Sequence, residues 1–95
     1  MDYKLSLREE AKRHITKGFV YYEEKSIGLG TRFVNEVEEI LDYIEKYPRH
    51  YQIKYKNYRE GILKVFPFVI IYEIFDREII VYAVFPTKDN PNKKP

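Results

Sequence analysis

The chain has 95 residues, of which 44% are hydrophobic and 34% charged, and a formal net charge of +2. This length supports one hydrophobic core, so residues 1–95 are expected to form a single domain, and the absence of cysteine excludes disulfides, thiolate metal sites and a cysteine nucleophile. No apolar run is long enough for a signal peptide or a membrane span, which predicts a soluble cytoplasmic protein.

The N-terminal residues predict a short strand followed by a helix. Apolar and polar residues alternate from Tyr3 to Leu7, as in a strand with one buried face. Ser6 is placed to act as a helix N-cap, with Glu9 three residues later. The helix should end near Lys25, and its apolar residues recur at spacings of four, four and three: Ala11, Ile15, Phe19 and Tyr22.

A second helix should follow a tight reversal. Gly28 and Gly30 favour the reversal, since glycine reaches positive φ, and Thr31 is a candidate N-cap. The helix should end at Tyr47-Pro48, because proline disfavours the α region for the residue before it. Its apolar stripe comprises Phe33, Val34, Val37, Ile40, Leu41 and Ile44. Acidic side chains flank the stripe and are interpreted as solvated surface: Glu36, Glu38, Glu39, Asp42 and Glu45.

The second half of the chain contains three β-type runs, Ile62–Val65, Phe68–Phe75 and Ile79–Phe85. Asp76-Arg77-Glu78 is a break of hairpin length, which predicts an antiparallel meander. Pro67 should mark a strand end. The preceding connection has room for a further short strand at residues 53–55, and residues 87–95 predict a flexible tail.

These elements predict an α+β fold in the order β-α-α-β-β-β. The N-terminal strand joins a mainly antiparallel four-stranded sheet, and an antiparallel helical hairpin packs on one face of it. The expected core comprises Ile15, Phe19, Phe33, Val37, Leu41, Ile44, Ile70, Tyr72, Ile80 and Ala83.

Motifs for metal or phosphate chemistry are weak. His14 and His50 are the two histidines, and neither has the spacing of a metal-ligand pair. The glycines at 28 and 30 lack the preceding strand and the lysine of a phosphate-binding loop. We therefore expect no metal and no other cofactor.

Charge is unevenly distributed along the chain. Residues 1–45 carry a net charge of −3 and residues 46–95 a net charge of +5. The densest basic cluster, opposed within it by Glu60 alone, comprises Lys46, Arg49, Lys54, Lys56, Arg59 and Lys64. Such a cluster attracts an anionic partner, either nucleic acid or an acidic protein segment. Four tyrosines among these cations would either cover the rim of the sheet or stack on bases: Tyr47, Tyr51, Tyr55 and Tyr58.

The order and spacing of several short motifs resemble the RelE/ParE family of bacterial toxins. In the second half these are Tyr58-Arg59, the Phe66-Pro67-Phe68 motif with its following strand, and the acidic turn before the last strand. In the first half they are Tyr21-Tyr22, the segment from Ser26 to Phe33, Glu36-Val37 and Tyr47-Pro48. The resemblance covers Arg8 to Pro91 and is greatest for the ParE-like, or plasmid-stabilisation, branch.

This resemblance implies the toxin of a type II toxin-antitoxin system. A ParE-like toxin would act by binding a target such as DNA gyrase, without catalysis. Its cognate antitoxin would be acidic with apolar anchors, and would suit a groove between helices and sheet. The residues assigned to partner binding are Arg49, Lys54, Lys56, Arg59 and Lys64.

Two alternative functions are compatible with the same fold. The first is a metal-independent, ribosome-dependent mRNA endoribonuclease of the RelE-like branch, which would use Arg59, Lys64 and Lys88. The sequence departs from that branch at Val69 and Asp89, where cations would be expected. The second alternative is a non-toxic interaction scaffold.

Overall fold

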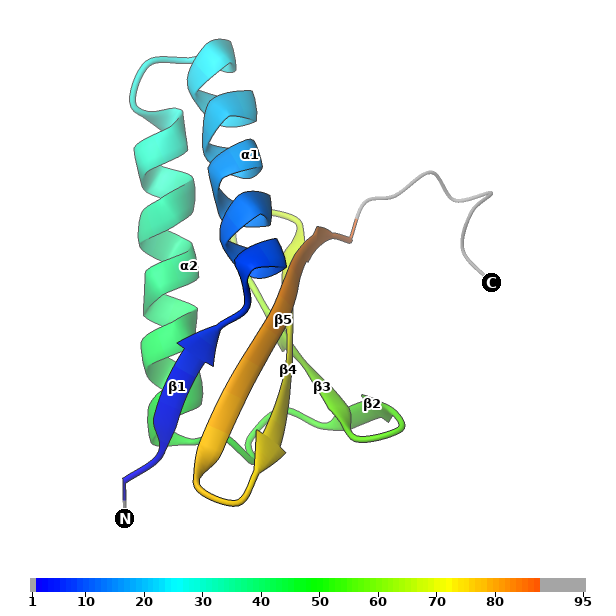
Figure 1. The fold of residues 1–95 in the computed structure, drawn as a ribbon. Helices are drawn as coiled ribbons and strands as arrows, with labels where there is room; N and C mark the ends of the chain where they lie inside the picture. Colours follow the sequence, from blue (N-terminus) through cyan, green and yellow to red (C-terminus); the bar gives the residue numbers. More distant parts are fainter. Residues whose placement is uncertain (1, 88–95) are drawn as a thin grey trace.

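A computed structural model describes residues 2–87 (Figure 1). Two helices form an antiparallel hairpin that packs on one face of a five-stranded sheet, which confirms the predicted α+β class. The elements are β1 (Lys4–Leu7), α1 (Glu9–Lys25), α2 (Leu29–Lys46), β2 (Ile53–Tyr55), β3 (Tyr58–Ile62), β4 (Phe68–Phe75) and β5 (Glu78–Pro86). Neither helix has the length and apolarity needed to cross a membrane. Residues 88–95 of the predicted tail lie outside the described part of the chain.

The strands are arranged in the order β1-β5-β4-β3-β2. β1 runs parallel to β5, and the other neighbours are antiparallel, as expected of a meander joined by an N-terminal strand. The fifth strand is β2, which forms the outer edge beside β3. The β4–β5 hairpin closes at the predicted place, with Phe75 opposite Glu78 and Asp76 at a φ of 58°. Aspartate tolerates this left-handed conformation better than most residues.

The helical reversal is held by a side chain that sequence reasoning missed. Gly28 is the N-cap of α2 with a φ of 90°, which requires glycine in practice. Ser6 and Thr31 do not cap helices, because Ser6 lies in β1 and Thr31 lies inside α2. Instead, the Glu23 carboxylate accepts hydrogen bonds from the backbone N–H groups of Gly28 and Gly30, both at 2.9 Å. It thereby satisfies donors that the start of a helix leaves unpaired.

The two helices approach each other closely at a glycine. A Cβ atom on Gly18 would lie 2.5 Å from a ring carbon of Phe33, so any larger residue would push the helices apart. The Phe33 ring in turn packs against Phe66 and Phe68 of the sheet side, with ring centroids 5.4 and 4.8 Å away. α1 is thus kept close to the end of the sheet.

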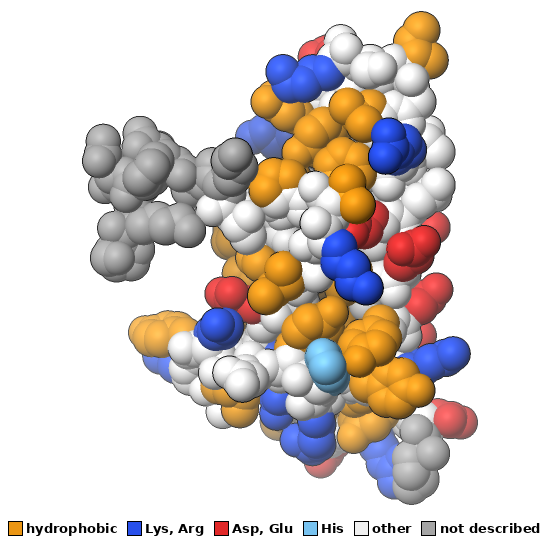
Figure 2. Space-filling view, turned by 180° about the vertical axis from the view of Figure 1, so that it is seen from behind, with side chains coloured by type: hydrophobic (Ala, Val, Ile, Leu, Met, Phe, Trp, Pro, Cys, Tyr) orange, Lys and Arg blue, Asp and Glu red, His pale blue; other side chains and the backbone are white. Residues whose placement is uncertain are grey.

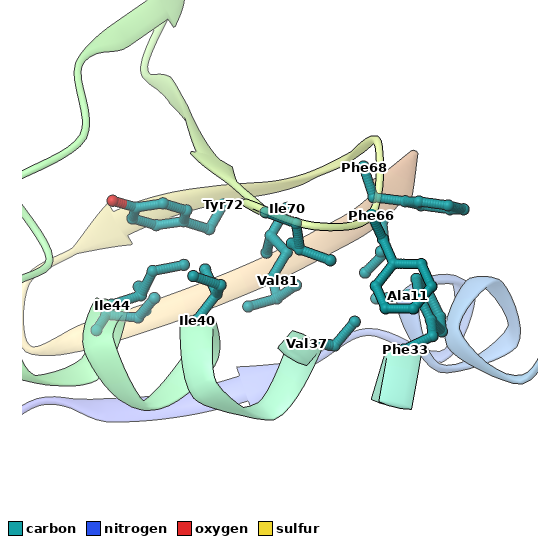
Figure 3. Close-up of a cluster of buried hydrophobic side chains, with 13 residues drawn as sticks. Ala11, Phe33, Val37, Ile40, Ile44, Phe66, Phe68, Ile70, Tyr72 and Val81 are labelled. Carbon is teal, nitrogen blue, oxygen red and sulfur yellow. The ribbon is translucent and has the colours of Figure 1, made fainter. Parts of the chain in front are cut away.

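The core lies between α2 and the sheet (Figure 3). Side chains from α2, among them Val37, Ile40 and Ile44, face Ile70 and Tyr72 from the strands. The Tyr72 hydroxyl donates a hydrogen bond to the Pro48 carbonyl at 2.7 Å, which fastens the end of α2 to the sheet. Burial raises the pKa of Tyr72 to about 12, so the hydroxyl stays protonated over the physiological range.

The predicted core is largely confirmed. Five of its members are buried in one cluster: Phe33, Val37, Ile44, Ile70 and Tyr72. Ile15 and Leu41 are half-buried against that cluster, and Phe19 is half-buried outside it. The assignment of Ile80 was wrong, because Ile79 and Val81 are the residues that enter the core. Ala83 is buried but lies outside the cluster, since an irregularity in the pairing of β4 with β5 shifts the alternation and directs Val84 inward.

A buried carboxylate fixes the loop between β3 and β4. Glu36 accepts hydrogen bonds from the backbone N–H groups of Lys64 at 2.7 Å, Val65 at 3.0 Å and Phe66 at 3.1 Å. Glu36 is 9% exposed, so its interpretation as solvated surface was wrong. The predicted strand at Ile62–Val65 was also misplaced, because these N–H groups bond to Glu36 and the strand ends at Ile62.

The hydrogen bonds also set the ionisation of Glu36. Burial of the carboxyl group would by itself raise its pKa, but the bonds from Val65, Phe66 and Lys64 outweigh burial and hold the pKa below its usual value. The folded protein therefore favours the ionised carboxylate.

Replacing Ile44 by Ala should lower the free energy of unfolding by about 2–5 kcal/mol, because Ile44 is fully buried. Ile27→Ala removes the same atoms at a position that is 95% exposed, and should change stability by less than about 0.5 kcal/mol. Urea denaturation of both variants provides the measurement. Equal effects would place Ile44 outside the core.

Replacing Glu36 by Gln should destabilise the protein by about 1–3 kcal/mol at pH 7, because the buried N–H groups lose their charged acceptor. Folding lowers the pKa of Glu36. The ionised carboxylate therefore contributes to stability above the unfolded-state pKa of about 4.3, and this contribution is lost as the pH falls through the folded-state pKa. Below about pH 4, the free energy of unfolding should accordingly fall less steeply in Glu36→Gln than in the unmodified protein. Glu39→Gln, on the exposed side of α2, is the control. It should change neither the free energy of unfolding at pH 7 nor the steepness of its fall in acid. A steep acid-induced fall that persists in Glu36→Gln would contradict this assignment.

Candidate functional site

An apolar groove runs between α1 and the C-terminal end of β5. It has a volume of about 600 Å³. Its walls are formed by His14, Lys17, Gly18, Tyr21 and Tyr22 of α1, by Val84, Phe85 and Pro86 of β5, and by Pro67 and Phe68 at the start of β4. The groove brings together residues some 70 positions apart in sequence, and Figure 1 shows α1 passing beside the end of β5.

His14 connects the two walls of the groove. Its Nδ1 accepts a hydrogen bond from the Val84 N–H at 3.1 Å, so the ring proton resides on Nε2, which lies 3.3 Å from a Glu10 carboxylate oxygen. The imidazole also contacts the Phe85 ring, with centroids 5.0 Å apart. Both imidazole nitrogens are therefore occupied by structural contacts.

Exposed apolar side chains and lysines border the groove. Tyr21 is 54% and Phe85 45% exposed, although both are large apolar groups. Lys17 lines the groove, and the Lys25 ammonium lies 4.7 Å from the centroid of the Tyr21 ring. Lys64 is exposed on the loop that Glu36 holds, but it does not line the groove. The groove thus combines an apolar floor with cationic edges.

The predicted partner-binding cluster is divided by the structure. Arg59 lies near the start of β3, where its guanidinium donates to the carbonyls of Tyr51 at 2.6 Å and Arg49 at 3.4 Å. Lys64 lies beyond the other end of β3. Arg49, Lys54, Lys56 and Arg59 therefore gather around the β2–β3 hairpin, whereas Lys64 stands apart on the loop between β3 and β4.

The cations required for RNA cleavage are not brought together within residues 2–87. Arg59 and Lys64 are separated by about five residues of chain, roughly 16 Å when extended. Val69 is a buried residue of β4. Lys88 and Asp89 lie outside the described residues. Within that range, moreover, no group of three His, Asp or Glu side chains is placed to hold a metal ion.

The face of the sheet away from the helices carries aromatic and charged side chains. Tyr82 occupies it, with its hydroxyl donating to Glu73 at 2.9 Å and its ring 5.5 Å from that of Tyr58. Arg8 lies over the Tyr82 ring at 5.6 Å. This face therefore carries paired aromatic and charged groups rather than converging cations.

A chain of aromatic contacts lies at the C-terminal end of α2. The rings of Tyr43 and Tyr47 are 5.1 Å apart, those of Tyr43 and His50 are 5.1 Å apart, and those of His50 and Tyr51 are 4.9 Å apart. The lower part of Figure 2 shows hydrophobic side chains around a histidine, with Lys and Arg side chains close by. Tyr51 packs against the core, but Tyr47 remains exposed. Packing therefore accounts for Tyr51, and stacking on bases stays a prediction for Tyr47.

Sequence reasoning missed the groove residues. His14 and Phe85 belonged to no recognisable motif. The Tyr21-Tyr22 pair was part of the family resemblance and offered one further signal, since one of two adjacent helical residues must point away from the core. Tyr22 does contact the core, and Tyr21 is exposed.

Comparison with known proteins gives one family and several similar structures. Residues 5–91 match the family model of the ParE toxin of type II toxin-antitoxin systems (parDE). No curated protein sequence matches significantly.

Three solved structures share the fold. The chromosomal ParDE system of P. aeruginosa gives a TM-score of 0.70 at 12% identity, covering 90% of this chain and 97% of that one. The E. coli DinJ-YafQ toxin-antitoxin complex gives 0.61 at 10% identity, with coverages of 90% and 93%. The conserved hypothetical protein HP0894 from Helicobacter pylori gives 0.57 at 22% identity, with coverages of 88% and 93%.

Proposed function

Because the chain belongs to the ParE toxin family of type II toxin-antitoxin systems, we propose that it arrests growth by binding a cellular target and is neutralised by a cognate antitoxin. The family match over residues 5–91 is the observation that carries this proposal, since it spans nearly the whole chain. DNA gyrase is the target we propose. Both partners would place the protein in the cytoplasm.

The groove between α1 and β5 is the proposed docking site of the antitoxin. Its exposed rings, Tyr21 and Phe85, would receive apolar anchors, and Lys17 and Lys25 would pair with acidic side chains beside them. Two of the structural neighbours come from toxin-antitoxin systems, which supports a partner of this class. None of the five residues predicted to bind the partner lines this groove: Arg49, Lys54, Lys56, Arg59 and Lys64.

Binding, rather than RNA cleavage, is the proposed mode of action. Attack by a ribose 2′-OH needs several cations at one phosphate, and removal of one such donor typically costs about 2.7–4 kcal/mol of transition-state stabilisation. Arg59 is held by two backbone carbonyls, and Lys64 lies beyond the far end of β3. Arg59 and Lys64 are therefore not placed to act together on one phosphate.

Replacing Phe85 by Ala should weaken the complex with the antitoxin at least fivefold, because truncation of an interface anchor commonly costs more than about 1 kcal/mol. The partner to be tested is the protein encoded by the adjacent gene, and isothermal titration gives the affinity. Phe75→Ala is the matched control. Phe75 is also an exposed phenylalanine, but it lies at the end of β4 that is remote from the groove. Equal losses in the two variants would place the antitoxin elsewhere.

Expression of the protein without its antitoxin should block DNA replication while leaving mRNA intact. Purified protein should inhibit DNA supercoiling by gyrase and should not cleave mRNA on translating ribosomes. Both reactions can be reconstituted from purified components. Codon-linked cleavage that disappears in Arg59→Ala or Lys64→Ala would instead establish the ribonuclease.

A further inference from the structure

Residues 46–59 have an unusual composition for an exposed segment. They include five Lys or Arg residues, four tyrosines and one histidine, but no Asp or Glu. They form the end of α2, the following loop, β2 and the turn into β3. In Figure 1 the β2–β3 hairpin projects from the body of the protein, away from α1 and the groove.

The cations of this segment have no acidic partners. On α1, Lys12 and Arg13 form ion pairs with Glu9 and Glu10. By contrast, within residues 2–87 none of the five cations of residues 46–59 forms an ion pair. Lys46 shares a hollow with Asp42 and Glu45, which reduces the local positive potential there. Among residues 2–87, the exposed cations without an ion pair on this segment include Arg49, Lys54 and Lys56, of which Arg49 shares a hollow with Asp76.

Exposed aromatic rings lie between these cations. Tyr55 is 66% exposed, and the Lys56 ammonium lies 5.5 Å from the centroid of its ring. Tyr47 is 56% exposed and is supported from behind by Tyr43. Because both rings are largely exposed, packing against the core does not account for either side chain, and part of each ring surface is free to contact a ligand.

Arg59 links the loop and the hairpin into one surface. Its guanidinium donates to the carbonyls of Arg49 and Tyr51 in the loop, while its backbone pairs with Ile53 of β2. Arg59 is thus a positioning residue, which holds the loop at Arg49 and Tyr51 against the hairpin. We define the hairpin surface as Tyr47, Arg49, His50, Lys54, Tyr55 and Lys56.

We propose that the hairpin surface binds single-stranded nucleic acid. Each nucleotide of a single strand offers a phosphate and an unpaired base face, which match a cation and an exposed ring that lie side by side. The Lys54-Tyr55-Lys56 sequence supplies that pairing within three residues. This inference goes beyond the antitoxin and target proposed above and uses a different part of the molecule.

Single strands fit the surface better than duplexes or acidic peptides do. A duplex would contact the lysines but would leave the tyrosine rings without a partner, because its bases are already stacked. An acidic peptide with apolar anchors would need an apolar pocket, whereas the hollow that Tyr47 lines with Tyr3 and Lys46 also carries the carboxylates of Asp2, Asp42 and Glu45. The apolar groove lies against α1 instead.

Fluorescence anisotropy with a labelled oligothymidine of about 12 nucleotides, long enough for a typical single-strand site, tests the proposal. Three phosphate contacts predict that the logarithm of the association constant falls with the logarithm of salt concentration with a slope of about −2. Lys54→Glu/Lys56→Glu should weaken binding and flatten that slope. Lys4→Glu, on the strand at the opposite edge of the sheet, should do neither.

The tyrosine variant separates stacking from charge. Tyr55→Ala should weaken binding roughly fivefold or more while leaving the salt slope unchanged, because it removes a ring and no charge. Tyr21→Ala, which removes a 54% exposed ring from the groove, should leave oligothymidine binding unchanged. Unfolding midpoints of all variants verify that they remain folded.

Three results would overturn the proposal. These are equal affinity for a duplex of the same length, equal losses in Tyr55→Ala and Tyr21→Ala, and no salt-dependent binding of oligothymidine at low salt. If Lys54→Glu/Lys56→Glu retained oligothymidine binding but lost the antitoxin, the hairpin surface would be a protein-docking surface. Failure of antitoxin binding in Phe85→Ala concerns the groove and leaves the hairpin surface unaffected.

Discussion

The hydrogen bonds between the Glu36 carboxylate and the loop after β3 constrain the rest of the structure. By engaging the N–H groups of Lys64, Val65 and Phe66, Glu36 ends β3 at Ile62 and fastens the sheet to α2. The chain then enters β4 through Pro67 and Phe68, which form one wall of the groove. A single buried anion, stabilised by backbone donors, thus determines both a strand boundary and the shape of a binding site.

This boundary separates two surfaces of different chemistry. The groove beside α1 is apolar with lysines at its edges, whereas the hairpin surface has exposed rings between unpaired cations. β3 lies between them, and its length keeps Lys64 away from Arg59. A toxin with two separate surfaces could engage its antitoxin and a nucleic-acid strand without direct competition between them.

Local patterns were sufficient to predict most of the fold. The apolar stripe of α2 has a clear helical period, and the residues of β4 and β5 are mostly β-branched or aromatic, so both were located correctly. Features that depend on distant residues were missed. Glu36 bonds to groups about 28 residues away, and Val84 meets His14 across 70 residues, so neither contact has a sequence signature. The pairing irregularity that directs Val84 into the core is likewise a property of two strands together.

The contact between His14 and Val84 has a consequence for association of the folded protein with itself. β1 covers the outer edge of β5 as far as Val81, and beyond that point an imidazole nitrogen accepts the Val84 N–H in place of a neighbouring strand's carbonyl. An uncovered edge of this kind is a template for intermolecular β-pairing and aggregation. His14 therefore protects a short stretch of strand that β1 is too short to reach, and it does so without closing the groove beside it.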